Sequence, residues 1–190
     1  ENMYEDLNIS IPKNQHTIIT GPNGSGKSTL LGLIAGTFYA SSGTVTSFTN
    51  DYGYVSATPM IINSNIRENI LYGNEKNFSD DLLIDYIEKF KVFNAGDVIN
   101  LDKRISNKML STGQMQKISF IRALISGVDI LVLDESMSNL DLNSKKLILD
   151  ILNEKELTII NSTHSPEDFQ GYDNHIVISI ENNLRKVSFS

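Results

Sequence analysis

The segment GPNGSGKST at residues 21–29 combines glycines, a lysine and hydroxyl side chains in the spacing G-x-x-x-x-G-K-[ST]. Glycines permit backbone conformations that a Cβ forbids, so that consecutive N–H groups can turn into one concavity. The Lys27 ammonium could bind β- and γ-phosphates, and the Ser28 hydroxyl suits Mg²⁺. A glycine-rich turn that binds nothing is the alternative. Because the segment follows an expected strand and opens an expected helix, it predicts a nucleotide-phosphate site, made by Gly21, Pro22, Asn23, Gly24, Ser25, Gly26, Lys27, Ser28 and Thr29.

A second group that could do chemistry is the acidic pair Asp134–Glu135, at the end of the apolar run ILVL. In an open α/β sheet, ligands gather at the carboxyl ends of the strands, so both carboxylates should face the phosphates. Asp134 would then join Ser28 as a Mg²⁺ ligand, directly or through water, and Glu135 would orient or deprotonate an attacking water. The alternative for the pair alone is a helix cap with a charged neighbour.

The elements that must position these residues follow from hydrophobic spacing. Apolar alternation and short apolar runs indicate strands, and apolar residues at helical spacing indicate helices. Strands are expected at 7–11, 17–20, twice within 43–55, at 128–133, at 157–161 and as a hairpin near 175–189, and helices after 28, over 80–93, through 113–126 and over 142–154. The alternation of strands and helices predicts an α/β sheet.

The composition narrows the class of protein. The 190 residues suit one domain, and the chain contains no cysteine, which excludes a disulfide scaffold and a thiolate metal site. A net charge of −7 argues against a broad nucleic-acid-binding surface, so no nucleic acid is expected as a partner. We find no apolar run as long as a membrane span and no signal-peptide pattern, and since the chain does not begin with Met we expect an excerpt of a longer protein.

Four further motifs carry a family resemblance. LSTGQMQK at 110–117 resembles the LSGGQ signature of ATP-binding cassette (ABC) domains, SNLD at 138–141 looks like the D-loop, and NSTHS at 161–165 is similar to the switch-histidine segment. NIRENILYG at 65–73 is similar to the stretch that follows the Q-loop in exporter-type cassettes, and the short connection 43–54 resembles that of the multidrug-resistance (C) subfamily.

The resemblance implies a fold. It is that of an α/β P-loop NTPase (RecA-like) core with a small antiparallel β region and an inserted α-helical subdomain that carries the signature. Residues 1–190 would be a single nucleotide-binding domain, with its core at about 1–56 and 127–190 and its helical subdomain at about 57–126.

The resemblance also implies that one chain cannot complete the site. Two cassettes would pack head to tail, as a homo- or heterodimer, with each ATP between one phosphate loop and the partner's signature, here Ser111, Thr112, Gly113 and Gln114. His164 would contact the γ-phosphate and hold the attacking water with Glu135. Taken alone, the signature also fits a serine-capped helix start, and a lone histidine is more often an ordinary polar residue.

The pattern departs from the family at several positions. Tyr54, Val55 and Pro59 fix the register of a Q-loop in which Ala57 stands where the family has glutamine, and Thr112 replaces a glycine of the signature. The aromatic residue that stacks on adenine would precede residue 1, and we expect Tyr4 to be a core residue. The segment 94–109 lacks the family's Glu-Arg-Gly element.

The resulting hypothesis is an ATPase, with ATP and Mg²⁺ as its ligands, that powers export through a transmembrane domain at the cytoplasmic face of a membrane while being soluble itself. Met60, Ile61, Ile62 and Ile66 would receive the transmembrane partner or pack inside the helical subdomain. The alternatives are a catalytically weak regulatory or interaction cassette, favoured by Ala57 and Thr112, and a soluble cassette of translation. The transported substrate does not follow from a cassette sequence.

Overall fold

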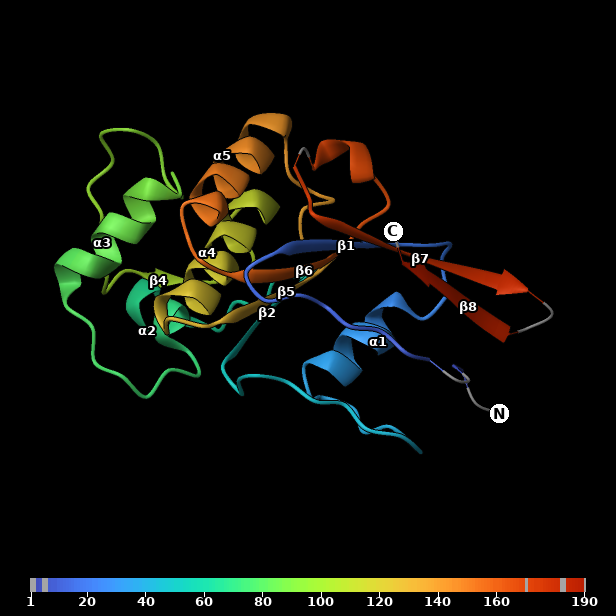
Figure 1. Ribbon diagram of the computed structural model, residues 1–190. Coiled ribbons are helices and arrows are strands. Elements are labelled where there is room, and N and C mark those ends of the chain that lie inside the picture. The colour runs from blue at the N-terminus through green and yellow to red at the C-terminus, as the bar shows by residue number, and fades with distance from the viewer. Residues whose placement is uncertain (1–2, 5–6, 170, 182–183, 190) are drawn as a thin grey trace.

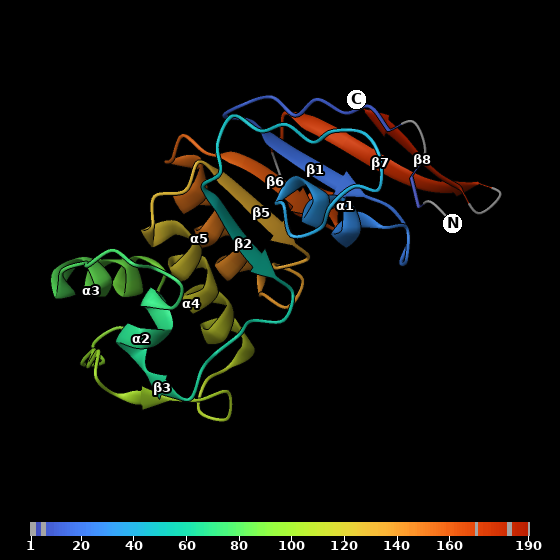
Figure 2. The same ribbon diagram turned by 90° about the horizontal axis from the view of Figure 1, so that it is seen from below.

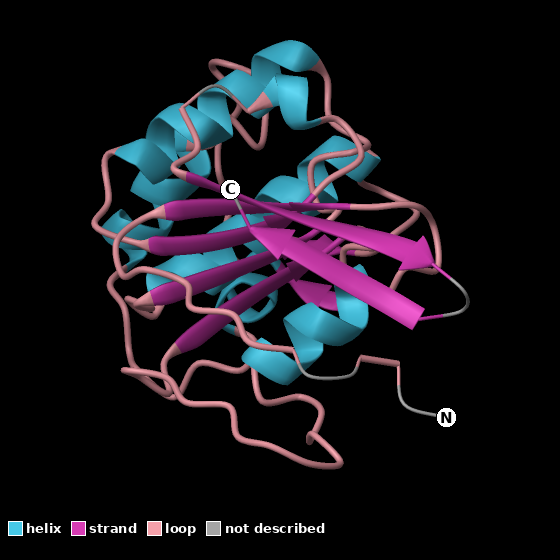
Figure 3. Cartoon of the chain, turned by 45° about the vertical axis from the view of Figure 1, so that its right-hand side comes forward, coloured by secondary structure: helices cyan, strands magenta, loops and turns pink. Residues whose placement is uncertain are grey.

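The computed structural model describes residues 3–4, 7–169, 171–181 and 184–189 of the chain. Within these residues the centre is a sheet in the order β2-β5-β6-β1-β7-β8, whose strands are labelled in Figure 1 and drawn in magenta in Figure 3. Its strands are β1 His16–Thr20, β2 Tyr52–Ser56, β5 Ile130–Asp134, β6 Thr158–Ser162, β7 Asn174–Glu181 and β8 Leu184–Phe189. All neighbours pair in parallel except β7 and β8, which form an antiparallel hairpin. The predicted α/β class is confirmed.

Helices cover both faces of the sheet. Helix α1 (Lys27–Ile34) lies on one face, and α4 (Thr112–Ile125) and α5 (Leu142–Asn153) lie on the other, as Figures 1 and 2 show. Beyond α4 lie α2 (Ile66–Leu71), α3 (Asp80–Lys89) and the short antiparallel pair β3 (Ser64–Asn65) and β4 (Arg104–Ile105). A 3₁₀ turn, η1 (Pro166–Asp168), follows β6. None of the helices in the described ranges is long and apolar enough to cross a membrane.

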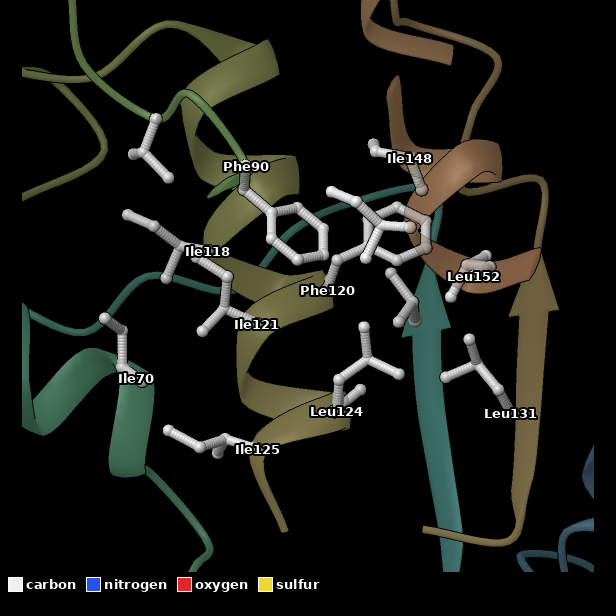
Figure 4. Packing of buried hydrophobic residues seen from close by; sticks show 14 of the residues in the cluster. Ile70, Phe90, Ile118, Phe120, Ile121, Leu124, Ile125, Leu131, Ile148 and Leu152 are labelled. Atoms are coloured by element: carbon white, nitrogen blue, oxygen red, sulfur yellow. The ribbon is translucent and has the colours of Figure 1, made fainter. Parts of the chain in front are cut away.

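The sequence of β5 explains this two-sided cover. Leu131 and Leu133 belong to the apolar cluster under α4 and α5, while Ile130 and Val132 belong to the cluster under α1. Successive strand residues point to opposite faces, so a strand buried on both sides is apolar throughout. Figure 4 shows Phe120 and Leu124 directed from α4 toward the sheet and α5. This cluster continues without interruption into α2 and α3, so the helical segment and the sheet share one core.

Two expected strands are not formed. Residues 7–11 and 43–49 have no strand pairing, and of the two strands expected within 43–55 only β2 exists. The alternation of apolar and polar residues in 7–11 still has a structural role. Its apolar members Leu7, Ile9 and Ile11 are partly buried against the cluster under α1. Both segments line a cavity of about 300 Å³ beside Leu30 and Ile34. An isolated two-stranded pair is marginal in water, so apolar packing on the helix replaces a ladder here.

A largely buried histidine makes the stability of the fold depend on pH. The His16 ring packs edge-on against Phe169, with ring centroids 5.9 Å apart, and burial lowers the pKa of His16 from 6.5 to about 4, against the opposing charge of Asp173. Between these two values the unfolded chain binds more protons than the folded one. The contribution of neutral His16 to the free energy of unfolding is therefore complete above pH 6.5. It falls by roughly 1–3 kcal/mol as the pH drops toward 4.

We therefore expect the free energy of unfolding, measured with urea, to fall more between pH 7 and pH 4.5 in the wild type than in His16→Gln, which has no titrating ring. The comparison with the variant removes the part of the pH dependence that comes from carboxylates. Equal losses in the two proteins would show that His16 does not carry this effect.

Candidate functional site: the phosphate loop and the acidic pair

The phosphate loop joins the end of β1 to the start of α1 in a conformation that needs glycine. Gly24 and Gly26 have φ of 74° and 99°, in the left-handed region. A Cβ on Gly26 would also lie 2.6 Å from the Tyr4 hydroxyl and 2.8 Å from the Met3 sulfur, which pack behind the loop. A side chain at either glycine would therefore be strained, and at Gly26 it would also collide with Tyr4 and Met3.

Lys27 is held at the centre of this loop. Its side chain is 5% exposed, and its Nζ donates to the carbonyl oxygens of Gly21 at 3.0 Å and Pro22 at 3.3 Å. The same ammonium lies 3.6 Å from Glu135 Oε1. A buried charge needs such partners, and the oxygens of a phosphate could take over the role of the loop carbonyls.

Asp134 ends β5 and accepts hydrogen bonds from three hydroxyl groups on three different elements. Its Oδ1 accepts from Ser28 at 3.0 Å and from Ser162 at 2.8 Å, and its Oδ2 accepts from Tyr54 at 3.0 Å. Burial, followed by the neighbouring Asp134 charge, raises the pKa of the Tyr54 hydroxyl, which therefore stays a donor at neutral pH. The structure thus brings together Ser28 and Asp134, the two predicted metal ligands.

Glu135 and His164 also meet. Glu135 Oε1 lies 2.7 Å from His164 Nε2, at the carboxyl ends of β5 and β6. The His164 side chain is 42% exposed and that of Glu135 31%, so both remain open to a ligand. Beside them is a cavity of about 90 Å³ that Asn161 and Lys145 also line. An exposed carboxylate next to an imidazole can hold and deprotonate a water.

The predicted signature residues lie elsewhere. Ser111 is the N-cap of α4: its hydroxyl accepts from the Gln114 N–H at 3.2 Å, and Gln114 Oε1 accepts from the Ser111 N–H at 2.9 Å. The serine-capped helix start is therefore present, with Ser111 and Thr112 exposed at the open end of the helix. A Cβ on Gly113 would lie 3.8 Å from Leu140, so the signature adjoins the D-loop segment. These two hydrogen bonds of Ser111 and Gln114 both lie inside the cap.

Ala57 follows directly on β2, where a different amide contacts the strand end. Gln116 of α4 is 1% exposed, and its Nε2 donates to the Ser56 carbonyl oxygen at 3.0 Å. The helix that begins with the signature is therefore tied to the end of β2 without a glutamine at position 57. Gln116 lies inside the motif on which the resemblance rests, but its spacing alone did not reveal this contact.

Sequence reasoning missed two further residues that touch Asp134. Tyr54 served only to fix the register of the Q-loop, and Ser162 was noted only as part of the segment NSTHS, just after the strand expected at 157–161. Their contacts follow from the pairing of β2 and β6 with β5, in which Ser56 and Ser162 both lie opposite Asp134. A polar residue at the end of an otherwise apolar strand was the available signal for Ser162. Tyr4, expected in the core, is partly buried against the cluster under α1.

Comparisons with known proteins show which sequences and which fold this chain resembles. A family model described as ABC transporter matches residues 4–138. ABC transporter C family member 6 of Dictyostelium discoideum is 33% identical over 182 residues, which cover 92% of this chain and 13% of that protein. The lactococcin-A transport/processing ATP-binding protein LcnC of Lactococcus lactis subsp. lactis is 33% identical over 180 residues, covering 85% of this chain and 25% of that protein.

Among solved structures, a bacterial Atm1-family ABC exporter with ATP bound superimposes with a TM-score of 0.80 over 92% of this chain and 34% of that one. Its sequence identity is 23%, so this likeness shows the fold. The predicted P-loop NTPase fold of an ABC nucleotide-binding domain is thereby confirmed. The chain spans less than a third of the length of the curated relatives described above.

Proposed function

The chain belongs to the ABC transporter family, and from this premise we propose that it binds and hydrolyses ATP to power export through a membrane domain. The observation that carries the proposal is the convergence of Lys27, Asp134 and Glu135 at one edge of the sheet, with 3.6 Å between Lys27 Nζ and Glu135 Oε1. Domains of this family bind ATP. The site residues named from the sequence are the ones we assign to that task here.

The residues present fit Mg²⁺ as the metal that accompanies ATP. Ser28 Oγ and Asp134 Oδ1 are oxygen donors 3.0 Å apart at the mouth of the phosphate loop. Mg²⁺ prefers such ligands and commonly takes one or two from protein, with the rest from phosphate and water. In the described part of the chain no three His, Cys, Asp or Glu side chains form a metal-binding group. When bound, the ion would neutralise phosphate charge.

Hydrolysis would depend on the Glu135–His164 pair. The Glu135 carboxylate can accept a proton from a water that attacks the γ-phosphate, and the 2.7 Å contact with His164 Nε2 fixes the direction in which Oε1 points. Lys27, which now binds the loop carbonyls, would bind the β- and γ-phosphates. Positioning and charge stabilisation are the main contributions in phosphoryl transfer.

Completion of the site would require a second cassette, from a copy of this chain or a relative. Ser111 and Thr112 are exposed at the N-terminus of α4, which is suited to receive a γ-phosphate from outside the chain. We propose residues 1–190 as one nucleotide-binding domain, with a core at about 1–56 and 127–190 and a helical subdomain at about 57–126.

The membrane partner would bind beside β2, at the cytoplasmic face of a membrane. Of the four residues considered for this contact, Ile61 and Ile66 are 7% and 2% exposed and belong to the core, while Met60 is 48% exposed. Met60 and Tyr72 line an open groove of about 320 Å³ along β2. We therefore include Met60 in the proposed contact surface and assign Ile61 and Ile66 to the core.

This function is tested by measuring the phosphate that the isolated domain releases from ATP in the presence of Mg²⁺. Because each site needs two cassettes, the rate per chain should rise with protein concentration before it levels off. No release above the background hydrolysis of ATP at any protein concentration would contradict the proposal for the isolated domain.

A second candidate is a regulatory cassette with little turnover, which the alanine at position 57 favours. An alanine methyl group can neither bind Mg²⁺ nor hydrogen-bond a water, whereas a glutamine amide can do both. In contrast, the contact between Glu135 and His164 favours hydrolysis.

Ala57→Gln is expected to raise the rate of ATP hydrolysis. One added hydrogen bond to the attacking water contributes about 1 kcal/mol, which corresponds to roughly fivefold. Phosphate release measures the effect, and Thr58→Gln is the matched control, because it places the same amide at the neighbouring position of the bend that follows β2. An unchanged or lower rate in Ala57→Gln would rule out a missing amide as the cause of slow turnover.

A further inference from the structure

Ser162 lies between the two strands that carry the site. It is the last residue of β6, where it pairs with Asp134 of β5 on one side and Ile19 of β1 on the other. Its side chain is fully buried, with 0% exposure. A buried hydroxyl needs hydrogen-bond partners, and those of Ser162 are both residues of the acidic pair.

The first partner is the carboxylate of Asp134. Ser162 Oγ donates to Asp134 Oδ1 at 2.8 Å, the same oxygen that accepts from Ser28 at 3.0 Å. A hydroxyl has one donor, so this bond fixes the direction of the Ser162 hydrogen and leaves its lone pairs as acceptors. The two hydrogen bonds, one from Ser28 and one from Ser162, together fix the position of Oδ1.

The second partner is the backbone of Glu135. The Glu135 N–H donates to Ser162 Oγ at 3.1 Å and to the Ser162 carbonyl oxygen at 3.1 Å. Glu135 has a φ of 51°, a left-handed conformation that is unfavourable for a residue with a Cβ. The two bonds to Ser162 compensate for this cost, and this conformation places Glu135 Oε1 2.7 Å from His164 Nε2.

We propose that Ser162 is a positioning residue for hydrolysis: its hydroxyl aims Asp134 at the metal-binding side and holds Glu135 in the conformation that faces His164. This inference rests on the proposed function, because it assigns Ser162 a part in the same reaction. Ser162 itself would touch neither ATP nor metal, since its side chain is fully buried against the Asp134 carboxylate and the Glu135 backbone.

Ser162→Ala removes only the hydroxyl, and Ser136→Ala is its matched control. Ser136 directly follows Glu135 and is 2% exposed, and in the described part of the chain its Oγ has no hydrogen-bond partner. Loss of a hydrogen bond to a charged group predicts a kcat roughly 10–100-fold lower in Ser162→Ala, with little change in KM for ATP. Ser136→Ala should stay within about twofold of wild type, as expected when no partner is lost.

A binding measurement separates positioning from loss of structure. The Mg²⁺ concentration that half-saturates binding of a fluorescent ATP analogue should be severalfold higher in Ser162→Ala, while binding in EDTA should be unchanged. An unchanged Mg²⁺ requirement together with a wild-type kcat would overturn the inference. Should Ser162→Ala fail to fold, Ser162→Cys keeps the size of the side chain with a weaker donor, and an intermediate rate is then expected.

The double variant Ser162→Ala/Glu135→Gln completes the test. At saturating Mg²⁺, which compensates for the part that acts through Asp134, the double variant should hydrolyse ATP about as slowly as Glu135→Gln alone, because residues that act as a unit are not additive. Multiplied effects would instead indicate a general structural role and contradict the inference. A wild type without hydrolysis would overturn the proposed function, whereas an active wild type with an equally active Ser162→Ala would overturn only this inference.

Discussion

Glu135→Gln is expected to lower the rate of ATP hydrolysis by about 10²–10⁴-fold, the usual contribution of a general base. Glutamine has the shape of glutamate but cannot take a proton from water. The change leaves the backbone bonds from Glu135 to Ser162 in place, and it removes the charge that now lies 2.7 Å from His164 Nε2 and 3.6 Å from Lys27 Nζ. Nucleotide binding should therefore survive while turnover is lost.

The measurement is steady-state phosphate release at saturating MgATP and matched protein concentration. Glu167→Gln is the control, because it neutralises an exposed carboxylate on the turn η1, which follows the neighbouring strand β6. Equal and measurable rates in wild type and Glu135→Gln would show that Glu135 is not the base, whereas two rates at background would contradict hydrolysis by the isolated domain.

Lys27→Ala should lose most of the affinity for ATP. The ammonium is the one positive side-chain charge that we assign to the phosphates, and each charge-assisted hydrogen bond contributes about 1.5–3 kcal/mol. We therefore expect a Kd for MgATP at least roughly 10–100-fold higher. The substitution also leaves the Gly21 and Pro22 carbonyl oxygens without their present donor, so the loop itself should loosen.

Titration with a fluorescent ATP analogue measures the loss, and thermal unfolding without nucleotide checks that the variant is folded. Lys13→Ala is the control: Lys13 is exposed and its Nζ lies 4.8 Å from the Phe48 ring centroid, away from the loop. A Kd in Lys27→Ala close to that of Lys13→Ala would contradict the placement of the phosphates.

The sequence predicted the secondary-structure elements best where one or both faces of an element are buried. The run that became β5 is apolar on both sides because α1 and α4 cover it, and the glycines of the phosphate loop are fixed by φ values that other residues avoid. Both signals are local. They were therefore available before any tertiary contact was known.

Predictions failed where the outcome depended on neighbours. Residues 7–11 alternate like a strand but find an apolar surface on α1 instead of a pairing partner. The contacts of Ser162 and Tyr54 with Asp134 arise from the register of three strands that are far apart in the chain. No spacing within the sequence specifies that register, so these two residues emerged only from the fold.

In the proposed arrangement one chain cannot complete an ATP site. The phosphate loop with Lys27 would bind ATP on one side, and the exposed Ser111 cap of a second cassette would bind it on the other. Light scattering of Glu135→Gln with and without MgATP tests this claim most directly, since this variant should bind ATP and keep it. We expect the mass of a monomer without nucleotide and of a dimer with MgATP, and a monomer under both conditions when Lys27→Ala is added. A Glu135→Gln chain that binds MgATP and stays monomeric at high protein concentration would contradict the claim.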